Sequence, residues 1–346
     1  MRLQNKSGII LLIALWTVVI LTMLAAGLGR RVSIELAMTK NALGKLRSKY
    51  IALGGLNYAM SLMSVKEAEN EPFSIDSKYH CGFTLREDQR PEDLFRGIKI
   101  KNGFFDIGFY GDAFGFEDEE SRININGLNA NNYEILSQLI LELGFDAEAA
   151  DTIAASAVDW IDGDDEMVSG AHGAENNYYI SRPEGYPCKN GYFDSINELA
   201  LVRGMTSEIF TKLKPYITVF PKEGSLLVNL NTASEEVLLA YAKNYAGDKT
   251  NTTVEDARRL VEKIVSYRRG DDGMWPSSDD RLLQVNEMVL NASERVIFMA
   301  LTQHQTPKSN FIRVTVRGVD ENTQTASVIE AVINRMDLSV LYWHRT

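Results

Sequence analysis

The sequence predicts an α+β protein in which a long N-terminal helix packs on an antiparallel sheet, with a large all-α block inserted between the strands. Three observations predict this class. An uncharged stretch, residues 9–28, continues without proline into a helical pattern that reaches about residue 65. Segments of alternating apolar and polar residues lie before residue 120 and after residue 310. Between these segments, apolar residues recur at helical spacing.

The uncharged stretch predicts a membrane anchor. At about 1.5 Å of rise per residue, twenty helical residues span the hydrocarbon core of a bilayer, which is about 30 Å thick. Arg30 and Arg31 follow the stretch directly. One interpretation is a secretory signal peptide that is cut near residues 25–27, which are small. The other is a cut between Gly8 and Ile9, before the apolar run, and this is favoured because the helix does not stop at residue 28.

The helix beyond the membrane carries an apolar stripe. Its residues form two series spaced by seven: Leu36, Leu43 and Tyr50, and Leu46, Leu53 and Met60. Such a stripe is typical of a helix that packs on its own domain, and we expect this for the C-terminal half at least. One helix should therefore run from the membrane into the body of the protein.

Short β segments surround the helical block. Asn102-Gly103 predicts a two-residue hairpin turn between two of them, and residues 320–322 predict a second turn. The predicted strands are Cys81–Arg86, Gly97–Lys101, Phe104–Tyr110, Phe311–Val319, Thr325–Arg335 and Leu338–His344. Strands on both sides of the block indicate one sheet with an insertion, which costs little extra entropy when the insertion is itself folded.

The block itself predicts an all-α region of about 180 residues. Its expected helices cover residues 132–143, 147–161, 194–203, 206–215, 233–244, 253–268 and 283–302. The predicted organisation is a leader at 1–8, a transmembrane segment at 9–29, a first α/β part at 30–120, the inserted helical domain at 121–305 and the C-terminal strands at 306–346.

The charge of the chain argues against a general nucleic-acid binder. The net charge is −11, and removal of residues 1–8 with their two basic side chains would make it −13. Such a chain repels nucleic acid unless a local basic patch prevails, and it suits cations. The two cysteines, Cys81 and Cys188, match no metal-binding spacing. In an exported body they can form one disulfide or remain separate thiols.

An acidic segment at residues 159–175 is the candidate metal site. Six carboxylates lie within these 17 residues, beside glycines that allow sharp turns. Calcium takes six to eight oxygen ligands from loops of this kind. The EF-hand pattern fails, because no Glu lies twelve positions after Asp162. A solvated acidic loop and a paired-carboxylate hydrolase are the alternatives, and no second signature supports the hydrolase. The candidate ligands are Asp159, Asp162, Asp164, Asp165 and Glu175.

Two stretches, 196–205 and 228–239, look like helix-hairpin-helix (SAM-like) elements. In DNA-binding proteins such hairpins present backbone N–H groups to phosphate. Here the surroundings are acidic or neutral, for example Glu198 and Glu235, and the cations needed for counterion release are sparse. A compact module used for packing is therefore favoured, and no nucleic-acid partner is expected. We also find no nucleophile arrangement and no phosphate-binding glycine motif in the sequence, so no enzyme is predicted.

Taken together, these motifs resemble the K-type minor pseudopilins of bacterial type II secretion systems. The leader ending in Gly8 and the apolar run resemble the N-terminus of all pilins. Residues 121–126, 159–164, 173–175, 197–199 and 228–233 resemble the body of the K-type family. Residues 245–253 and 271–280 match no motif of that family.

This resemblance implies a pilin-like body with an inserted helical domain. It implies that prepilin peptidase cuts after Gly8 and methylates the new amine of Ile9. It implies a single-pass protein of the inner membrane, with the body in the periplasm, at the tip of a pseudopilus. The implied partners are the I, J and H minor pseudopilins and the major pseudopilin, and the implied cofactor is Ca²⁺ in the loop of Asp162.

Ile13 would be the fifth residue after the cut. Most pilins carry a glutamate there, which the resemblance implies to pair with the N-terminal amine of another subunit inside the filament. Ile13 offers no charge, which favours a place at the tip; it can also be just another membrane residue. A minor pilin of a related type IV pilus, and a membrane-anchored nucleic-acid binder, remain the alternative functions.

Overall fold

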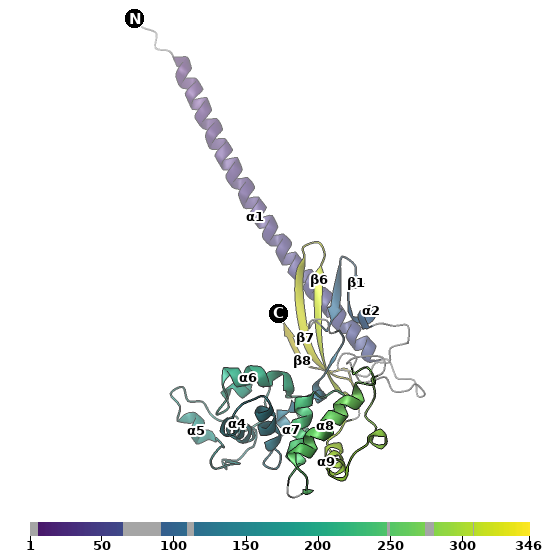
Figure 1. Ribbon diagram of the computed structural model, residues 1–346. Helices are drawn as coiled ribbons and strands as arrows, with labels where there is room; N and C mark the ends of the chain where they lie inside the picture. Colours follow the sequence, from purple (N-terminus) through teal and green to yellow (C-terminus); the bar gives the residue numbers. More distant parts are fainter. Residues whose placement is uncertain (1–5, 65–90, 109–113, 248–249, 274–279, 307) are drawn as a thin grey trace.

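The computed structural model describes residues 6–64, 91–108, 114–247, 250–273, 280–306 and 308–346. One long helix, α1 (Lys6–Met63), packs with its C-terminal half on an antiparallel sheet (Figure 1). The helical block lies at the end of the sheet away from the free end of α1. The predicted fold class is confirmed.

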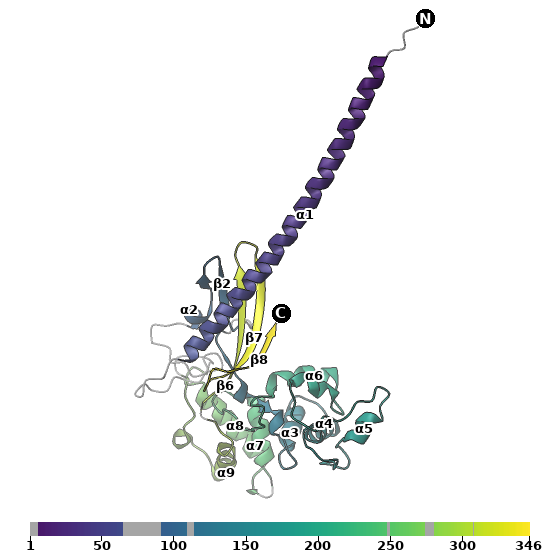
Figure 2. The same cartoon turned by 180° about the vertical axis from the view of Figure 1, so that it is seen from behind.

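The N-terminal half of α1 stands clear of the body (Figures 1 and 2). It contains one segment that is long and apolar enough to cross a membrane, and none of that segment is buried against the protein. Ile13, for example, is 57% exposed. Burial of twenty apolar side chains in water-free surroundings must therefore come from something other than this chain, such as a bilayer.

Small residues form the face of α1 that packs on the sheet. Gly44, Ser48, Ala52 and Ala59 are buried at spacings of four or seven, which places them on one side of a helix. Ser48 and Ser327 exchange a hydrogen bond of 2.9 Å between their hydroxyls. At Gly55 an added Cβ would lie 2.5 Å from Val316 Cγ1, so the close approach of helix and sheet depends on the missing side chain.

The predicted apolar stripe is not this face. Leu36, Leu43, Leu46 and Tyr50 are exposed, and only Leu53 and Met60 of the stripe are half-buried. The prediction that the C-terminal half of the helix packs on its own domain is confirmed, but residues other than the stripe make most of the contact. The physical reason is that the sheet approaches α1 closely enough to require glycine, serine and alanine, and a row of leucines would hold it away.

The sheet has the strand order β1-β2-β6-β7-β8, and β3 also pairs with β6; every pairing is antiparallel. Its strands are β1 (Ile98–Ile100), β2 (Gly103–Ile107), β3 (Glu117–Asp118), β6 (Phe311–Asp320), β7 (Thr325–Asn334) and β8 (Val340–Arg345). A short helix, α2 (Pro91–Phe95), precedes β1. The predicted strand at 81–86 lies outside the described residues.

The predicted hairpin between β1 and β2 is confirmed, but its turn is one residue earlier than predicted. Ile100 pairs with Gly103, so Lys101 and Asn102 make the turn, and Lys101 adopts a φ of 47°. Gly103 is already in β2. A Cβ there would lie 2.2 Å from the Val319 carbonyl oxygen, so glycine is needed for strand packing and not for the turn.

The helical block lies between β3 and β6 in the chain. Its α-helices are α3 (Glu134–Glu142), α4 (Ala147–Asp159), α5 (Asn176–Ile180), α6 (Ser207–Leu213), α7 (Glu235–Tyr245), α8 (Val254–Arg268) and α9 (Ala292–Thr302). Its 3₁₀ turns are η1 (Glu119–Ser121), η2 (Ile125–Gly127), η3 (Ile196–Leu201), η4 (Lys214–Tyr216) and η6 (Val285–Glu287).

Three details of this block differ from the prediction. The segment expected as a helix at 194–203 is the 3₁₀ turn η3, and the last helix begins at Ala292 and not near 283. Two short strands, β4 (Ile123–Asn124) and β5 (Ile217–Thr218), form a parallel pair inside the block. The region is therefore not purely α, because the motif at 121–126 crosses it in an extended conformation.

Two hydrophobic cores stabilise the structure. One lies between α1 and the sheet and includes Leu56, Phe105 and Val316. The other fills the helical block and includes Leu139 and Phe298. The core of the block also includes Val332 of β7, so the sheet joins the block through apolar contacts on this side as well as through polar residues.

Replacing Gly55 by Ala should destabilise the protein, because the new methyl group would press on Val316 and on the Phe105 ring. Overpacking of this kind costs about 1–3 kcal/mol. Gly54→Ala is the matched control: its Cβ would approach only Ile100 Cδ1, at 3.3 Å, and alanine gains helix propensity. Denaturant unfolding should show a loss for Gly55→Ala alone, and equal stability of the two variants would contradict the packing described here.

Candidate functional site

The side chain of Asp159 binds two parts of the acidic loop that follows α4 by hydrogen bonds. Helix α4 begins at its N-cap Asp146, whose side chain accepts a hydrogen bond from the Ala149 amide, and Asp159 is its last residue. The side chain of Asp159 is fully buried. Its Oδ1 accepts from the Val168 amide at 2.8 Å and its Oδ2 from the Ala174 amide at 2.6 Å. The loop is therefore folded by hydrogen bonds within the chain.

Gly173 lets the loop close. A Cβ at this residue would lie 2.3 Å from Asp159 Oδ2 and 2.9 Å from the Ser169 carbonyl oxygen. Both neighbours are fixed, since Asp159 is buried and the Gly173 amide donates to the Ser169 carbonyl. The family motif at 173–175 thus has a steric basis in this structure.

Asp162 and Glu175 bring two further carboxylates to Asp159. One oxygen from each of the three groups lies within 4.8 Å of the others. Both carboxyl oxygens of Glu175, and Oδ1 of Asp162, are buried without a hydrogen-bond partner among the residues that the structure describes. A buried carboxylate without a partner is costly, so these oxygens need a cation or a proton.

The pKa values of Glu175 and Asp162 are both raised, as expected for buried carboxylates without partners. Burial, followed by the charges of Asp159 and Asp162, raises the pKa of Glu175 to about 7. Burial and the charge of Asp164 raise the pKa of Asp162 to about 6. Oxygen ligands from carboxylates suit hard cations such as Ca²⁺. The residues present therefore fit a bound calcium ion, and the three carboxylates would hold it.

Asp164 and Asp165 do not join this cluster. Both are exposed, and Oδ1 of Asp164 accepts a hydrogen bond from the Glu166 amide. Of the five ligands predicted from the sequence, the structure brings together three: Asp159, Asp162 and Glu175.

Aromatic rings pack together next to the acidic loop. Trp160, directly after Asp159, contacts Tyr179 edge to face with ring centroids 5.1 Å apart, and it stacks on Phe193 at 6.3 Å. Tyr179 belongs to α5, whose N-cap position is Glu175. Edge-to-face contacts add about 0.5–1.5 kcal/mol each beyond burial. The backbone around the two unpartnered carboxylates is thereby held in place.

Cys188 lies beside this loop as a free, buried thiol. Its Sγ is 3.5 Å from the carbonyl oxygen of Asp159. Burial raises the pKa of the thiol to about 11, so it stays protonated at neutral pH. Its predicted disulfide partner, Cys81, lies outside the described residues.

A second group of buried charges, missed in the sequence, joins the block to the sheet. Glu119 in η1 is fully buried, and Arg122 donates to it at 2.9 Å. Arg313 from β6 and Thr218 from β5 also donate to the same carboxylate. Burial opposes ionisation, but the charges of Arg313 and Arg122 outweigh it and hold the pKa of Glu119 below its usual range.

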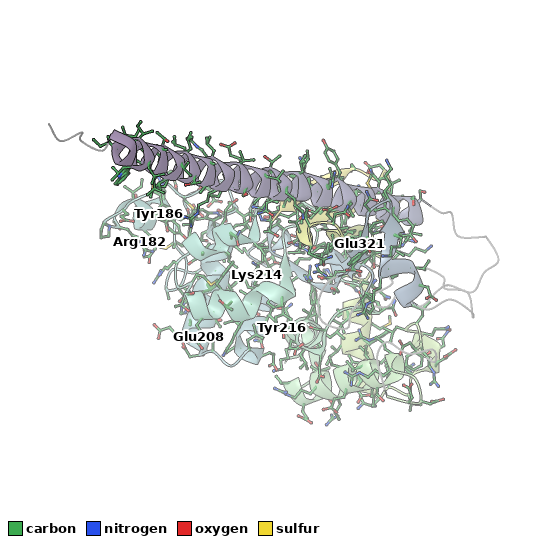
Figure 3. All side chains as sticks on the ribbon, turned by 90° about the horizontal axis from the view of Figure 1, so that it is seen from above. Arg182, Tyr186, Glu208, Lys214, Tyr216 and Glu321 are labelled. Carbon is green, nitrogen blue, oxygen red and sulfur yellow. The ribbon has the colours of Figure 1, made fainter. Side chains whose placement is uncertain are left out.

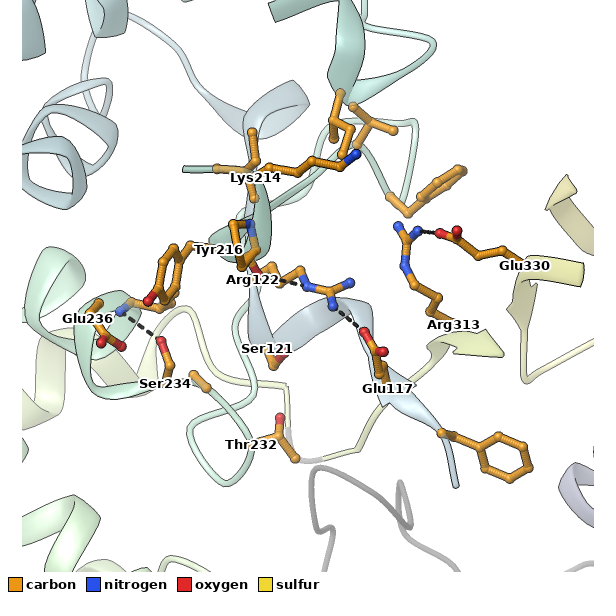
Figure 4. A pocket seen from close by; sticks show the side chains of 18 of the residues that line it. Glu117, Ser121, Arg122, Lys214, Tyr216, Thr232, Ser234, Glu236, Arg313 and Glu330 are labelled. Carbon is orange, nitrogen blue, oxygen red and sulfur yellow. Dashed lines mark hydrogen bonds and ion pairs between the residues drawn. The ribbon is translucent and has the colours of Figure 1, made fainter. Parts of the chain in front are cut away.

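A groove of about 1120 Å³ runs along this junction (Figure 4). Arg122 points toward Glu117, and Arg313 points toward Glu330 on the facing strand. The arginines are therefore shared between the buried Glu119 and the walls of the groove. The acidic run 117–120 and the arginine at 122 were visible in the sequence, but their partner Arg313 is almost 200 residues away.

The asparagine side chains of the motif at 121–126 make hydrogen bonds to the backbone in place of those that a regular sheet makes between its strands. Oδ1 of Asn126 accepts from the Phe193 amide at 2.7 Å, and its Nδ2 donates to the carbonyls of Phe193 and Val219. Nδ2 of Asn124 donates to the Pro221 carbonyl. The motif thus binds two chain segments of the block, at 193 and at 219–221, by side-chain amides.

The motif at 228–233 also joins chain segments by hydrogen bonds, in this case to residues 118–120. Asn229 and Thr232 donate to Oδ2 of Asp118, at 3.0 and 2.6 Å. The Asn229 amide donates to the Glu120 carbonyl. Both stretches that resembled helix-hairpin-helix elements contribute side chains to the core of the block: Leu199 and Val202 from the first are buried, and so are Val228, Leu230 and Ala233 from the second.

An exposed membrane-length segment, carried by a helix that seats on an antiparallel sheet, defines a pilin-like protein. The inserted helical block distinguishes this chain within that class.

The comparisons identify the branch. A family model described as type II secretion system protein K matches residues 121–222. Protein K of Pseudomonas aeruginosa is 25% identical over 74% of this chain and 73% of its own length, and that of Klebsiella pneumoniae 24% over 75% of each. The crystal structure of the GspK-GspI-GspJ complex from enterotoxigenic Escherichia coli contains a chain with a TM-score of 0.62 at 19% identity, covering 89% of this chain and 99% of that one. The resemblance seen in the sequence is confirmed: this chain is similar to type II secretion system protein K over about three quarters of its length, and it shares the fold of a chain in the GspK-GspI-GspJ complex.

Replacing Glu120 by Gln should change the pH dependence of stability. Burial, with the nearby charge of Asp118, raises the pKa of Glu120 to about 7 in the folded protein despite a hydrogen bond from the Asn310 amide. Between the unfolded value near 4.5 and this value, the folded state holds a proton that the unfolded chain has lost. The free energy of unfolding therefore falls as pH rises through this window.

Glu120→Gln removes that fall. We expect the variant to be more stable than the parent at pH 8, by roughly 2 kcal/mol, and similar to it at pH 4. Urea titrations at several pH values measure the difference. A constant difference across the whole range would show that the pKa of Glu120 does not change on folding.

Proposed function

We propose that this protein is the K-type minor pseudopilin at the tip of the periplasmic pseudopilus of a type II secretion system. Its role would be structural and not catalytic: it would nucleate assembly of the pseudopilus that exports folded proteins across the outer membrane. The observation that carries the proposal is α1, a single helix that joins a bare apolar segment of membrane length to the sheet.

The proposal includes the location and the partners. The protein would cross the inner membrane once, with its sheet and helical block in the periplasm. Its neighbours would be the I and J minor pseudopilins, which share a solved complex with the related GspK, together with the H type and the major pseudopilin. A protein that displays twenty exposed apolar residues on a helix needs both a membrane and helical neighbours.

Processing is the first consequence. Gly8 and Ile9 are both exposed near the start of α1, where a peptidase can reach them. We expect prepilin peptidase to cut between them and to methylate the amine of Ile9. Mass spectrometry of protein from membranes should find N-methylated Ile9 as the first residue, and an N-terminus near residues 26–28 would indicate a signal peptide.

The tip position is tested by counting and by the residue at position 13. Ile13 lies in the bare half of α1 and offers no carboxylate to the amine of a neighbouring subunit. The block would also crowd neighbours inside a filament shaft. Gold labels on a tagged full-length chain should appear once per filament, at one end. Function should not require a glutamate at position 13. Labels along the whole shaft would overturn the tip assignment.

Calcium would bind the cluster of Asp159, Asp162 and Glu175. Its charge would offset the repulsion among three carboxylates that lie within 4.8 Å of one another. The unpartnered oxygens of Asp162 and Glu175 support this assignment most directly. A bound cation would therefore stabilise the folded loop, and with it the position of α5.

Calcium should raise the melting temperature of the parent protein, and EDTA should reverse this. Binding only to the folded state adds about 2.7 kcal/mol at a concentration of 100 times the Kd. Glu175→Gln should abolish this response. In EDTA, however, the variant should be at least as stable as the parent, because a buried, unpartnered charge has been removed.

Asp165→Asn is the matched control. Asp165 is exposed and lies outside the cluster, so this variant should respond to calcium like the parent. A response that is lost equally in both variants would point to general charge and against a specific site. No response in the parent would remove the calcium proposal altogether.

A further inference from the structure

The last strand of the sheet, β8, has an open edge. It pairs with β7 on one side, and no strand among the described residues pairs with its other side. Val328 and Thr346 exchange two backbone hydrogen bonds, of 3.1 and 3.0 Å. Because such pairs alternate along an antiparallel ladder, the N–H and C=O groups of Trp343 and Arg345 point away from β7. These groups can bind a further strand.

One face of β8 is turned toward the groove at the junction of sheet and block. The register places Arg313, Val332 and Tyr342 in one row across the sheet. Two residues further along β8, His344 pairs with Glu330, and both side chains lie on the same face as that row. All of these residues except Val332 line the groove. A strand added to β8 would therefore direct every second side chain into the groove.

The opposite face of β8 carries exposed apolar side chains. Leu341 is 39% exposed and Trp343 is 45% exposed. Trp343 pairs with Ala331, which is buried in the core between α1 and the sheet, so it continues the apolar face of the sheet beyond that core. The remaining side chains of an added strand would lie beside Leu341 and Trp343, and apolar ones would remove these two from water.

Charge indicates which side chains suit the groove. Arg122 and Arg313 are already paired with carboxylates of the chain. Lys214 is exposed, lines the same groove and has no carboxylate partner among the residues that the structure describes. Its side chain extends toward the Arg313 side of the groove, opposite Glu236, in Figure 4, and in Figure 3 it lies nearer to the strands than Glu208 does. A carboxylate that enters beside β8 would thus meet an unshared cation.

A second copy of the chain does not fit this edge. Two identical strand edges form a closed pair when they run antiparallel, related by a two-fold axis across the strands. Such an axis would turn the second α1 end for end, because the strands run beside α1 (Figure 1). The membrane-length segment of the second copy would then point away from the membrane that holds the first. The occupant is therefore a different polypeptide.

We propose that the open edge of β8 and the groove bind an extended segment of a different polypeptide, in which apolar and acidic residues alternate. Its backbone would add a strand to the sheet. Its apolar side chains would cover Leu341 and Trp343, and its carboxylates would enter the groove toward Lys214. A free terminus or loop fits this geometry, since its side chains must pass between the sheet and η4. The inference goes beyond the proposed function, which assigns nothing to this edge.

The test uses the full chain in detergent, and its probe is a fluorescent heptapeptide of alternating Glu and Val. Fluorescence anisotropy should show saturable binding of this probe, and about tenfold weaker binding of a heptapeptide of alternating Lys and Val. Two further probes carry methyl groups on the backbone nitrogens of all the valines or of all the glutamates. Only one of these two sets of amides can face β8, so one methylated probe should lose about tenfold in affinity while the other binds like the parent probe.

Two pairs of protein variants test the edge and the groove. The Trp343 N–H points away from β7, so Trp343→Pro removes a donor to the added strand and none from the sheet. Trp343→Val retains that donor, and it should bind the Glu–Val probe about tenfold more tightly than the proline variant. Lys214→Glu should weaken the probe about tenfold, whereas Lys212→Glu, an exposed cation that does not line the groove, should bind it like the parent protein.

Three results with the probes would overturn the inference: no saturable binding of the Glu–Val probe, equal binding of the Lys–Val probe, or equal effects of the two methylation patterns. A dimer of the full chain that Trp343→Pro dissociates would also overturn it, because a second copy would then occupy the edge. None of these results bears on the proposed function, which is tested separately by purification of the I- and J-type proteins with the unmodified chain.

Discussion

The buried carboxylate of Glu119 is the interaction on which the relation between sheet and helical block depends. It is reached by Arg313 from the sheet, by Thr218 from the block and by Arg122 from the chain between them. A fully buried charge tolerates no loss of a partner, because the remaining charge would be left without compensation. These polar contacts help to fix the position of the block, together with the apolar contact that Val332 of β7 makes with the core of the block.

The acidic loop shows the same chemistry without the arginines. Glu175 is buried like Glu119, but its two oxygens have no donor in the described part of the chain, and its pKa moves in the opposite direction. One carboxylate is satisfied by the fold and the other is left for a cation. Asp159 lies between these cases, because two backbone amides occupy its oxygens and it organises the loop around the unsatisfied pair.

Local patterns in the sequence predicted the elements well and the surfaces poorly. Alternation located β6 and β7, and the N-cap Thr253 agrees with the helix start that spacing suggested, whereas the helix capped by Asn291 begins later than predicted. The acidic loop was found because its ligands lie close together in sequence. The face of α1 was misjudged, because periodicity shows that apolar residues share a side but not which side meets the sheet. The Glu119–Arg313 pair was missed because no local pattern links residues so far apart.

The chain leaves the sheet and returns to it at one place, where Asp118 pairs with Ile312 and the Asn310 amide donates to Glu120. The block is thus attached by two adjacent antiparallel strands and not by a single hinge. A force along α1 passes into the sheet at the row of small residues that packs on it. From the sheet it passes to the block through these two adjacent strands and through the Glu119 ion pairs. Two parallel connections resist bending of the block relative to the sheet more than a single connection would.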